Sequence, residues 1–414
     1  MIVKPMIRSN ICINAHPVGC AKEVEAQIAY VRSMNARRSR KPGAPVSGGT
    51  HAGGASAPVK AVLVLGCSTG YGLASRITAA FGYGAATVGV SFEKEGSETK
   101  SGTPGWYNNL AFDRASAREG IPSFTINGDA FSDDVRRQVI EAAKRMNLSF
   151  DFVVYSLASP VRTDPDTGVL YKSVLKPFGK PYTGNTVDPM SGKLSVMSAE
   201  PASDEEAANT VKVMGGEDWE RWIKQLSEAG VLARGCSTVA YSYIGPELSH
   251  AIYRDGTIGG AKKHLEATAR SMSKAMSASI GGAAFVSVNK GLVTRSSAVI
   301  PIIPLYLAVL FKVMKEKGTH EGCIEQIERM YAERFYAGTP VPVDDAGLVR
   351  IDELEMDDGV QAEVNRRLAL VTEENLPELG DLDGYRHDFL AASGFDVAGV
   401  DYDADVARMD TIGD

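Results

Sequence analysis

The sequence predicts an α/β fold built around a doubly wound parallel sheet, and three observations favour that fold. Short and almost wholly apolar runs recur along the 414-residue chain, as strands buried on both faces require. Stretches in which apolar residues recur at helical spacing separate most of these runs. A glycine-rich turn follows the first core run, residues 59–65, and opens a helical stretch.

The predicted elements alternate along the chain as such a sheet requires. Ahead of the core, we expect a strand within residues 3–13 and a helix over residues 22–33. The core strands are expected at residues 59–65, 86–92, 121–126, 151–158, 237–244 and 284–289. Helices are expected from the glycine turn to about residue 82, and at residues 132–147, 218–229, 258–279 and 297–316.

Composition and charge exclude several classes of protein. The chain is 44% hydrophobic and 23% charged, which is typical of a globular protein, and its net charge of −7 disfavours nucleic-acid binding. The longest apolar run, residues 298–311, is too short for stable membrane insertion and fits a buried helix or a pocket wall. The N-terminus lacks a secretory signal and the five cysteines form no C-x-x-C pair, so we expect a cytoplasmic protein with free thiols.

The glycine turn carries the first functional signal. Gly66, Gly70 and Gly72 lie between a buried strand and a helix, where glycines let the backbone approach a pyrophosphate at the helix N-terminus. Glu93 ends the next strand, 27 residues after Gly66, close to the roughly 20 expected of a ribose-binding acid. A carboxylate there repels a 2′-phosphate and so favours NADH over NADPH, although the adjacent Lys94 works against this selectivity.

A dinucleotide should therefore lie along the carboxyl ends of the strands. Asp129 and Ala130 are expected against the adenine, and Leu157 and Ala158 along the crevice. The turn and the end of the second strand add the expected contacts Gly66, Cys67, Ser68, Thr69, Gly70, Tyr71, Phe92 and Glu93.

A tyrosine and a lysine follow the fifth core strand at an unusual spacing. Tyr253 and Lys262 are nine residues apart, a rotation of about 900° that places them on opposite faces of a continuous helix. They can face one site only if Tyr253 lies before the helix. Gly256 breaks the helical pattern and Thr257 is a suitable N-cap, so the helix should begin near Ile258 with Lys262 on its second turn.

The chain resembles the trans-2-enoyl-CoA reductases and the V-type enoyl-acyl carrier protein reductases, relatives of the short-chain dehydrogenases that are marked by Tyr-x8-Lys. The matching stretches extend over nearly the whole chain: residues 12–20, 66–72, 105–108, 127–131, 214–219, 253–262, 292–294, 315–323 and 399–403. Two features depart from the family pattern. Residues 34–58 are longer than the usual connection, and Arg254 stands where a tryptophan is common.

The resemblance implies NADH-dependent reduction of the 2,3 double bond of a trans-2-enoyl thioester, carried on CoA or acyl carrier protein, in fatty acid synthesis. Tyr253 would stabilise the enolate and donate a proton, while Lys262 would hold the nicotinamide ribose. Tyr243 would contact the substrate thioester, and Lys263 should turn away from the site. The expected flank of the nicotinamide is Leu292, Val293 and Thr294. The family also implies a monomer.

The sequence and the family resemblance together divide the chain into segments that should form one integrated catalytic unit. Residues 1–33 are expected to pack on the core, and residues 34–58 to form a flexible linker. Residues 59–330 are expected to form the Rossmann-like catalytic domain, with a flap at residues 160–200, and residues 331–414 a C-terminal extension.

Alternatives to the reductase remain open at this point. The same tyrosine and lysine would serve an NAD(P)-dependent ketone or alcohol dehydrogenase, and the fold alone would serve a non-catalytic NADH-binding regulator. We expect no metal site, since His320 and Cys323 supply only two ligands. Of the 42 glycines, those at 66, 70 and 72 should admit the pyrophosphate, and those at 256, 259 and 260 should allow the nine-residue step from tyrosine to lysine.

Overall fold

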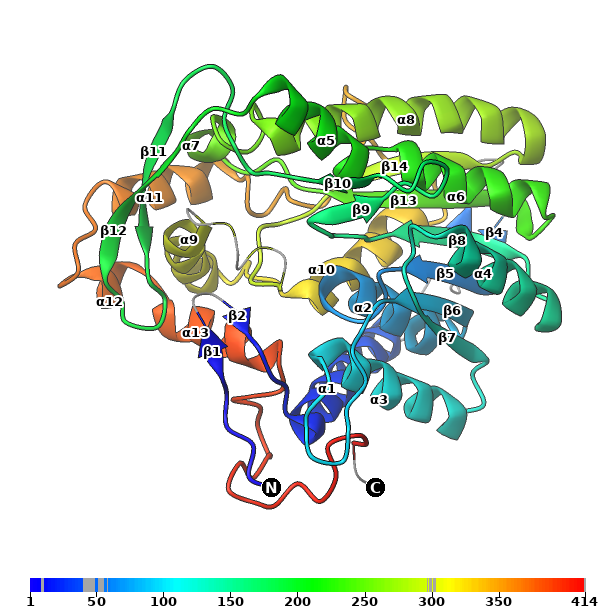
Figure 1. The fold of residues 1–414 in the computed structure, drawn as a ribbon, viewed down its shortest axis with the longest axis horizontal. Coiled ribbons are helices and arrows are strands. Elements are labelled where there is room, and N and C mark those ends of the chain that lie inside the picture. Colours follow the sequence, from blue (N-terminus) through cyan, green and yellow to red (C-terminus); the bar gives the residue numbers. More distant parts are fainter. Residues whose placement is uncertain are drawn as a thin grey trace.

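A seven-stranded sheet forms the centre of the protein, which we describe from a computed structural model (Figure 1). The structure describes residues 1–8, 11–39, 49–50, 56–57, 59–295, 297, 300 and 303–412. In spatial order the strands are β15 (Leu348–Arg350), β14 (Ala283–Val288), β13 (Leu232–Ser242), β8 (Phe150–Tyr155), β5 (Ala61–Leu65), β6 (Ala86–Ser91) and β7 (Ser123–Asn127). Every pairing in this sheet is parallel, so the predicted fold class is confirmed. The chain order reverses between β5 and β8, where doubly wound sheets open a crevice for ligands.

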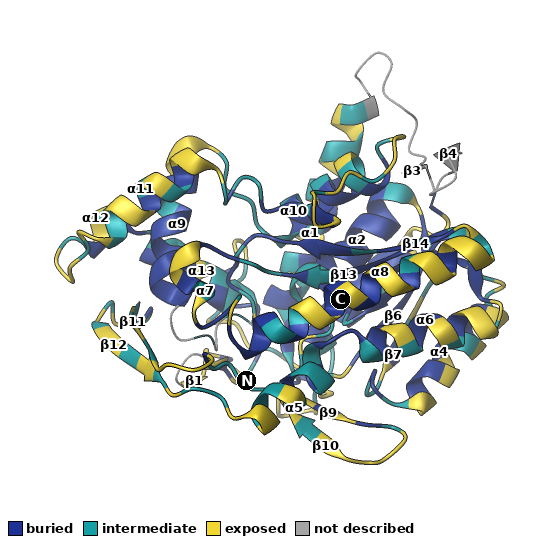
Figure 2. Ribbon diagram, turned by 90° about the horizontal axis from the view of Figure 1, so that it is seen from above, coloured by how far each residue is buried: buried dark blue, intermediate teal, exposed yellow. Residues whose placement is uncertain are grey.

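Helices cover both faces of the sheet. One face packs against α1 (Pro17–Ser39), α2 (Gly70–Ile77) with its continuation η1 (Thr78–Gly82), α3 (Pro104–Arg118), and α10 (Cys323–Met330) with η2 (Tyr331–Phe335). The other face packs against α4 (Asp133–Arg145), α6 (Glu217–Glu228) and α8 (Thr257–Ile280). Figure 2 shows the exposed outer sides of α4, α6 and α8 and their buried sides toward the strands. This burial on both faces explains why the strands read as continuous apolar runs.

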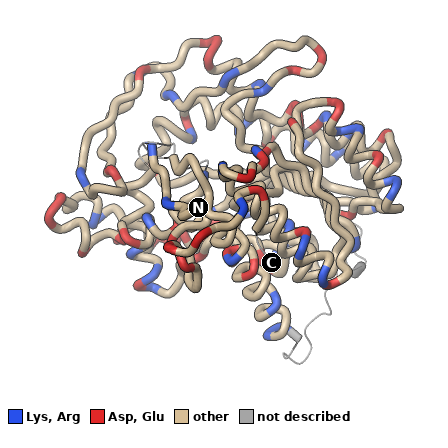
Figure 3. The backbone as a smooth tube through the Cα atoms, turned by 60° about the horizontal axis from the view of Figure 1, so that its bottom comes forward, with Lys and Arg blue, Asp and Glu red and all other residues tan. Residues whose placement is uncertain are grey.

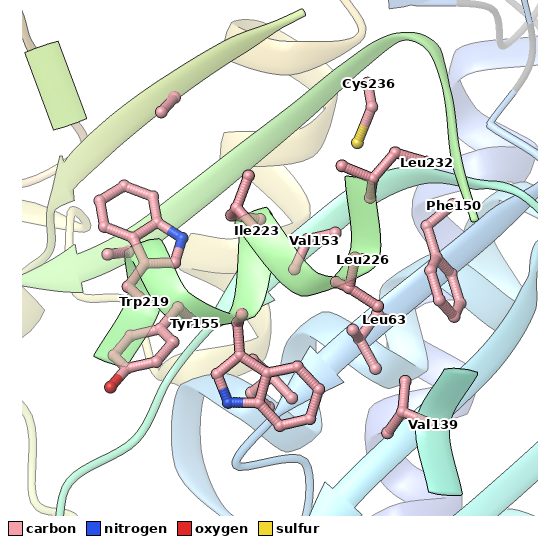
Figure 4. Packing of buried hydrophobic residues seen from close by; sticks show 14 of the residues in the cluster. Leu63, Val139, Phe150, Val153, Tyr155, Trp219, Ile223, Leu226, Leu232 and Cys236 are labelled. Atoms are coloured by element: carbon pink, nitrogen blue, oxygen red, sulfur yellow. The ribbon is translucent and has the colours of Figure 1, made fainter. Parts of the chain in front are cut away.

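Hydrophobic side chains of α6 pack against this face of the sheet (Figure 4), and aromatic and buried polar contacts hold it there. Trp219 lies beside Tyr155, with 6.2 Å between ring centroids, and its Nε1 donates to Thr238 Oγ1 at 2.9 Å. The Tyr155 hydroxyl donates to Asp218 at 3.0 Å, and the same carboxylate pairs with the buried Arg136. These contacts tie α4 and α6 to the end of β8, beside the crevice.

A second layer surrounds α9 (Ile303–Lys317), whose side chains are largely buried. Helices α11 (Asp358–Leu368) and α13 (Leu382–Ala391) and the hairpin of β11 (Tyr182–Val187) and β12 (Leu194–Ala199) enclose it (Figure 1). A second hairpin, β9 (Val161–Thr163) with β10 (Leu170–Lys172), completes the segment predicted as a flap. The short helices α7 (Glu247–His250) and α12 (Leu376–Leu379) lie in connections.

Several predicted elements differ from the structure. The segment 3–13 is a small hairpin of β1 (Ile7–Arg8) and β2 (Ile11–Cys12) rather than one strand. Helix α1 runs to Ser39, into the predicted linker, and most of residues 40–58 lie outside the described residues. Beyond Ser39, the described parts of the linker are the short paired strands β3 (Gly49–Thr50) and β4 (Ser56–Ala57). Helices α3, α5 (Asp204–Met214), α11 and α13 and the seventh strand, β15, were not predicted, because their patterns are short or weakly periodic.

Charged residues of both signs are interspersed along the outer elements, while the central strands carry few of them (Figure 3). Within the described part of the chain, no helix combines the length and the apolar character needed to cross a membrane.

Candidate active site

The glycine turn after β5 has a geometry that only glycine permits. Gly66 and Gly70 have φ angles of +86° and +52°, in the left-handed region. A Cβ on Gly66 would lie 2.3 Å from the carbonyl oxygen of Ser156, and one on Gly72 would lie 1.8 Å from that of Gly66. Thr69, the N-cap of α2, makes no side-chain capping bond. The turn therefore presents a close, uncapped helix N-terminus, which fits the pyrophosphate of a dinucleotide.

Glu93 lies against this turn from the next strand. Its Oε1 accepts a hydrogen bond of 2.6 Å from Ser68 Oγ, and its Oε2 lies 3.6 Å from Arg295 Nη1. Gly105 allows the approach, since a Cβ there would lie 2.2 Å from Glu93 Oε1. The ring of Phe92 is 78% exposed beside it and free to pack against a ligand. A carboxylate held here fits the adenosine ribose.

The other expected contacts surround the same crevice. Leu157 Cδ2 lies 3.4 Å from the position a Cβ would take on Gly66, and the Thr294 methyl lies 3.6 Å from that position on Gly70. Ala158, next to Leu157, is exposed, whereas Leu292 and Val293 are buried. The ends of β5, β8 and β14 thus converge on the glycine turn.

The side chains of two expected contacts at the turn have partners within the protein. Cys67 is buried, and its Sγ lies 3.6 Å from Asn109 Oδ1, so only its backbone can meet a cofactor. The Tyr71 hydroxyl donates to the Lys290 carbonyl at 2.7 Å.

Asp129 and Ala130 follow β7 in a tight turn. Asp129 Oδ1 accepts from the Phe131 N–H at 2.9 Å, which holds the turn closed. The Ala130 carbonyl accepts from Trp222 Nε1 at 3.0 Å, so α6 supports the position. Asp129 keeps a partly exposed side chain at the strand end.

The break between Tyr253 and α8 is present. The Tyr253 carbonyl accepts from the N–H groups of Gly256 and Gly259, at 3.2 and 2.9 Å. A Cβ on Gly256 would lie 2.4 Å from the Ile252 carbonyl oxygen. A Cβ on Gly259 would lie 1.8 Å from the Arg254 carbonyl oxygen. Tyr253 therefore lies in a turn before the helix, as predicted.

Two details of the predicted break are wrong. Gly256 rather than Thr257 is the N-cap of α8, because the Thr257 hydroxyl donates to the Val174 carbonyl instead. Gly260 is not needed for the step, since a Cβ there would only touch Phe178 at 3.8 Å.

Tyr253, Tyr243 and Lys262 form a partly buried group beyond β13. The rings of Tyr243 and Tyr253 meet edge to face with centroids 5.3 Å apart. Lys262 Nζ donates to the Tyr241 carbonyl at 3.0 Å. Burial raises the pKa of Tyr253 to about 12, and burial lowers the pKa of Lys262 to about 8, against the opposing charge of Glu266. Burial thus keeps the Tyr253 hydroxyl protonated at neutral pH and brings the pKa of Lys262 closer to neutral.

Lys263 is turned away from this group. Its side chain is 59% exposed and its Nζ lies 4.0 Å from Asp255 Oδ1. Arg254, which departs from the family pattern, pairs with Glu266 on α8 at 2.7 Å. The two basic neighbours of the predicted pair therefore have partners of their own.

The sequence did not point to Glu355, which lies next to this group. It is fully buried and accepts from the hydroxyls of Tyr243 and Tyr306, at 3.1 and 2.8 Å. Glu355 lies in a locally acidic stretch, residues 352–358, where a glutamate is expected to be exposed, and no local sequence pattern indicates its burial.

Three family models match the chain, and together they extend over most of its length. The NAD(P)H binding domain of trans-2-enoyl-CoA reductase matches residues 2–98. The trans-2-enoyl-CoA reductase catalytic region matches residues 100–336, which is more than half of the chain. The chain belongs to the trans-2-enoyl-CoA reductase family. The third model, the enoyl reductase FAD binding domain, matches residues 343–406.

Similar proteins agree with this assignment. Trans-2-enoyl-CoA reductase [NADH] of Treponema denticola is 66% identical over 414 residues, 100% of both chains. Enoyl-[acyl-carrier-protein] reductase [NADH] of Flavobacterium johnsoniae is 52% identical over 99% of this chain and 98% of its own. The crystal structure of the Treponema denticola enzyme in complex with NAD matches with a TM-score of 0.93 and 64% identity over 100% of both chains. The predicted family, fold, reductase activity and nicotinamide cofactor are confirmed.

The FAD named by the third family model does not fit the residues matched to it. The N-terminus of α11 is capped by Asp357, which accepts from the Val360 N–H at 3.0 Å. The N-terminus of α13 is capped by Asp381, which accepts from the Gly384 N–H at 2.9 Å. Each carboxylate occupies donors that a pyrophosphate would need and carries the same sign of charge. The reductase uses these helices to enclose α9, and we assign them no flavin.

The glycines of the break can be tested by a matched pair of substitutions. Gly259→Ala should lower activity by a factor on the order of 100, because the added methyl group displaces the Tyr253 turn and a shift of about 1 Å in a reacting group costs that much. Gly260→Ala, one residue along the same helix, should keep activity and stabilise the fold by about 0.5 kcal/mol. Steady-state rates and thermal melting of both variants measure this. Equal losses of activity would show that the close approach at Gly259 does not set the site.

Proposed function

We propose that this reductase converts trans-2-enoyl-CoA thioesters to saturated acyl-CoA with NADH, in fatty acid synthesis, and that Tyr253 is the proton donor. The observation that carries the proposal is the position of Tyr253 outside α8, with its hydroxyl protonated and Lys262 on the following helix. CoA is favoured as the carrier because the 66% identical relative is named an enoyl-CoA reductase and the 52% identical one an acyl-carrier-protein enzyme.

The residues have separate parts in the reaction. NADH held by the glycine turn, Glu93 and Lys262 would supply the hydride for the β-carbon of the substrate. As negative charge builds on the thioester oxygen, the Tyr253 hydroxyl stabilises the enolate by hydrogen bonding and supplies the proton that ends on the α-carbon. Lys262 binds the nicotinamide ribose, and its positive charge favours loss of the Tyr253 proton. The buried loop at Leu292 and Val293 excludes water beside the nicotinamide.

The remaining contacts hold the cofactor. The uncapped start of α2 binds the pyrophosphate, and Glu93 binds the adenosine ribose and disfavours a 2′-phosphate. We propose that the enzyme acts as a cytoplasmic monomer. The five free cysteines, four of them buried, support a reducing compartment, and the family resemblance supports the monomer.

The activity is tested by mixing the protein with NADH and crotonyl-CoA and following the loss of nicotinamide absorbance. We expect turnover with a higher kcat/KM for crotonyl-CoA than for the same acyl chain on acyl carrier protein. Tyr253→Phe should lower kcat by roughly 100- to 10,000-fold, since general acid catalysis contributes that much, while NADH binding measured by fluorescence survives. Turnover of acetoacetyl-CoA but not crotonyl-CoA would indicate a ketone reductase, and NADH binding without any turnover a regulator.

Lys262 should confer a pH dependence on cofactor use. Below its pKa of about 8 the ammonium group donates to the ribose, so kcat/KM for NADH should be high there and fall as the pH rises through about 8. Lys262→Ala should lower kcat/KM about tenfold and remove this dependence, because a hydrogen bond from a charged group is lost. Lys263→Ala, at the exposed neighbouring position, should keep the wild-type profile. If Lys263→Ala lost the pH dependence and Lys262→Ala kept it, the ribose contact would belong to Lys263.

Cofactor selectivity should depend on Glu93. Glu93→Gln removes the charge that opposes a 2′-phosphate, so the ratio of kcat/KM for NADPH to that for NADH should rise about tenfold or more. Glu95→Gln removes the same charge from an exposed position two residues along and should leave the ratio unchanged. An unchanged ratio in Glu93→Gln would place the ribose contact elsewhere.

A further inference from the structure

The C-terminal segment supplies one fully buried carboxylate to the site, Glu355, from the loop between β15 and α11. Its Oε1 accepts from the hydroxyls of Tyr243 and Tyr306, at 3.1 and 2.8 Å. Its Oε2 accepts from the Gly291 N–H at 2.7 Å. Three donors, from the residue after β13, from α9 and from the loop after β14, therefore meet on one side chain, and buried carboxylates require such hydrogen bonding.

A buried lysine balances this carboxylate. Lys290 Nζ donates to the Gly291 carbonyl at 3.1 Å and lies 4.5 Å from the centre of the Phe311 ring. Burial lowers the pKa of Lys290 to about 8, and Glu355 opposes that shift. The Lys290 carbonyl in turn accepts from Tyr71 of the glycine turn. Glu355 thus contacts Tyr243 directly and is connected to the glycine turn through the Lys290–Gly291 backbone and Tyr71.

The hydrogen bond from Tyr243 restricts what that tyrosine can do. A tyrosine hydroxyl has one hydrogen, and here it is donated to Glu355, so the Tyr243 oxygen can only accept further hydrogen bonds. A thioester oxygen is also only an acceptor. Tyr243 therefore cannot donate to the thioester while it is held by Glu355, although its ring packs edge to face on Tyr253.

We propose that Glu355 is a positioning residue: it holds the hydroxyl hydrogen of Tyr243, fixes that ring against Tyr253, and leaves Tyr253 as the one tyrosine of this pair able to donate to the thioester oxygen. The inference rests on the proposed function, in which Tyr253 is the proton donor. It gives Tyr243 a part different from the direct thioester contact that the family resemblance implies. It also gives the segment matched to an FAD binding domain a role in enoyl reduction that needs no flavin.

A double-mutant cycle tests the proposal. Glu355→Gln and Tyr243→Phe should each lower kcat for crotonyl-CoA about tenfold by loosening the Tyr253 ring, with KM for NADH unchanged. The double variant should lose no more than either single variant, because both remove the same interaction. Gln361→Met is the matched control. Gln361 on α11 donates to the Glu355 backbone carbonyl at 2.7 Å and to the Tyr306 hydroxyl at 3.1 Å, and it leaves the Tyr243–Glu355 bond intact, so its loss should lower the melting temperature but keep kcat within about twofold.

A loss in kcat of about 100-fold in the double variant, which is the product of the two single losses, would overturn the proposal. A wild-type kcat in Glu355→Gln would overturn it as well. If Glu355→Gln fails to fold because Lys290 is left unpaired, the cycle is run with Lys290→Met in all proteins, which removes both buried charges. Thermal melting of the same variants gives a readout independent of activity. The melting temperature should fall no further in the double variant than in the single ones, and additive falls would refute the Glu355–Tyr243 bond. Absence of crotonyl-CoA reduction by the wild type would instead refute the proposed function.

Discussion

Parallel pairing of the seven strands is the constraint on which the rest of this reductase depends. Parallel neighbours need crossover connections, so helices cover both faces and the strands become buried on both sides. The same pairing places every carboxyl end at one edge of the sheet. Groups that are far apart in the sequence therefore lie along one edge of the sheet. They are the glycine turn after β5, Glu93 after β6, Leu157 after β8, Tyr243 after β13 and the loop at Leu292 after β14.

Burial sets the chemistry of the groups gathered at that edge. Loss of hydration keeps the Tyr253 hydroxyl protonated and lowers the pKa of Lys262 to about 8, so the charge of Lys262 changes close to neutral pH. The same loss of hydration raises the pKa of Glu355, while Lys290 and the hydrogen bonds from Gly291 and Tyr306 oppose that shift. Glu355, Tyr243, Tyr306 and Lys290 therefore form a buried network in which each of these side chains has a hydrogen-bond partner.

The C-terminal segment belongs to that network rather than to a separate cofactor domain. Helices α11 and α13 cap their own N-termini with aspartates and pack on α9, and the loop before them carries Glu355, which accepts from the Tyr243 hydroxyl. α9 is buried between this segment and the hairpin of β11 and β12, so the segment closes the apolar layer next to the active site.

Sequence alone determined the features that local rules govern. Apolar runs marked six of the seven core strands, and the order of glycines, strand and helix marked the cofactor turn. The nine-residue step required a helix break, because the angle between side chains on a helix follows from spacing alone. Only the tertiary structure decided that Gly259 is essential to the close approach and Gly260 is not, and that Glu355 is buried among hydroxyls. Those outcomes depend on which distant atoms come within contact distance, and no local pattern encodes that.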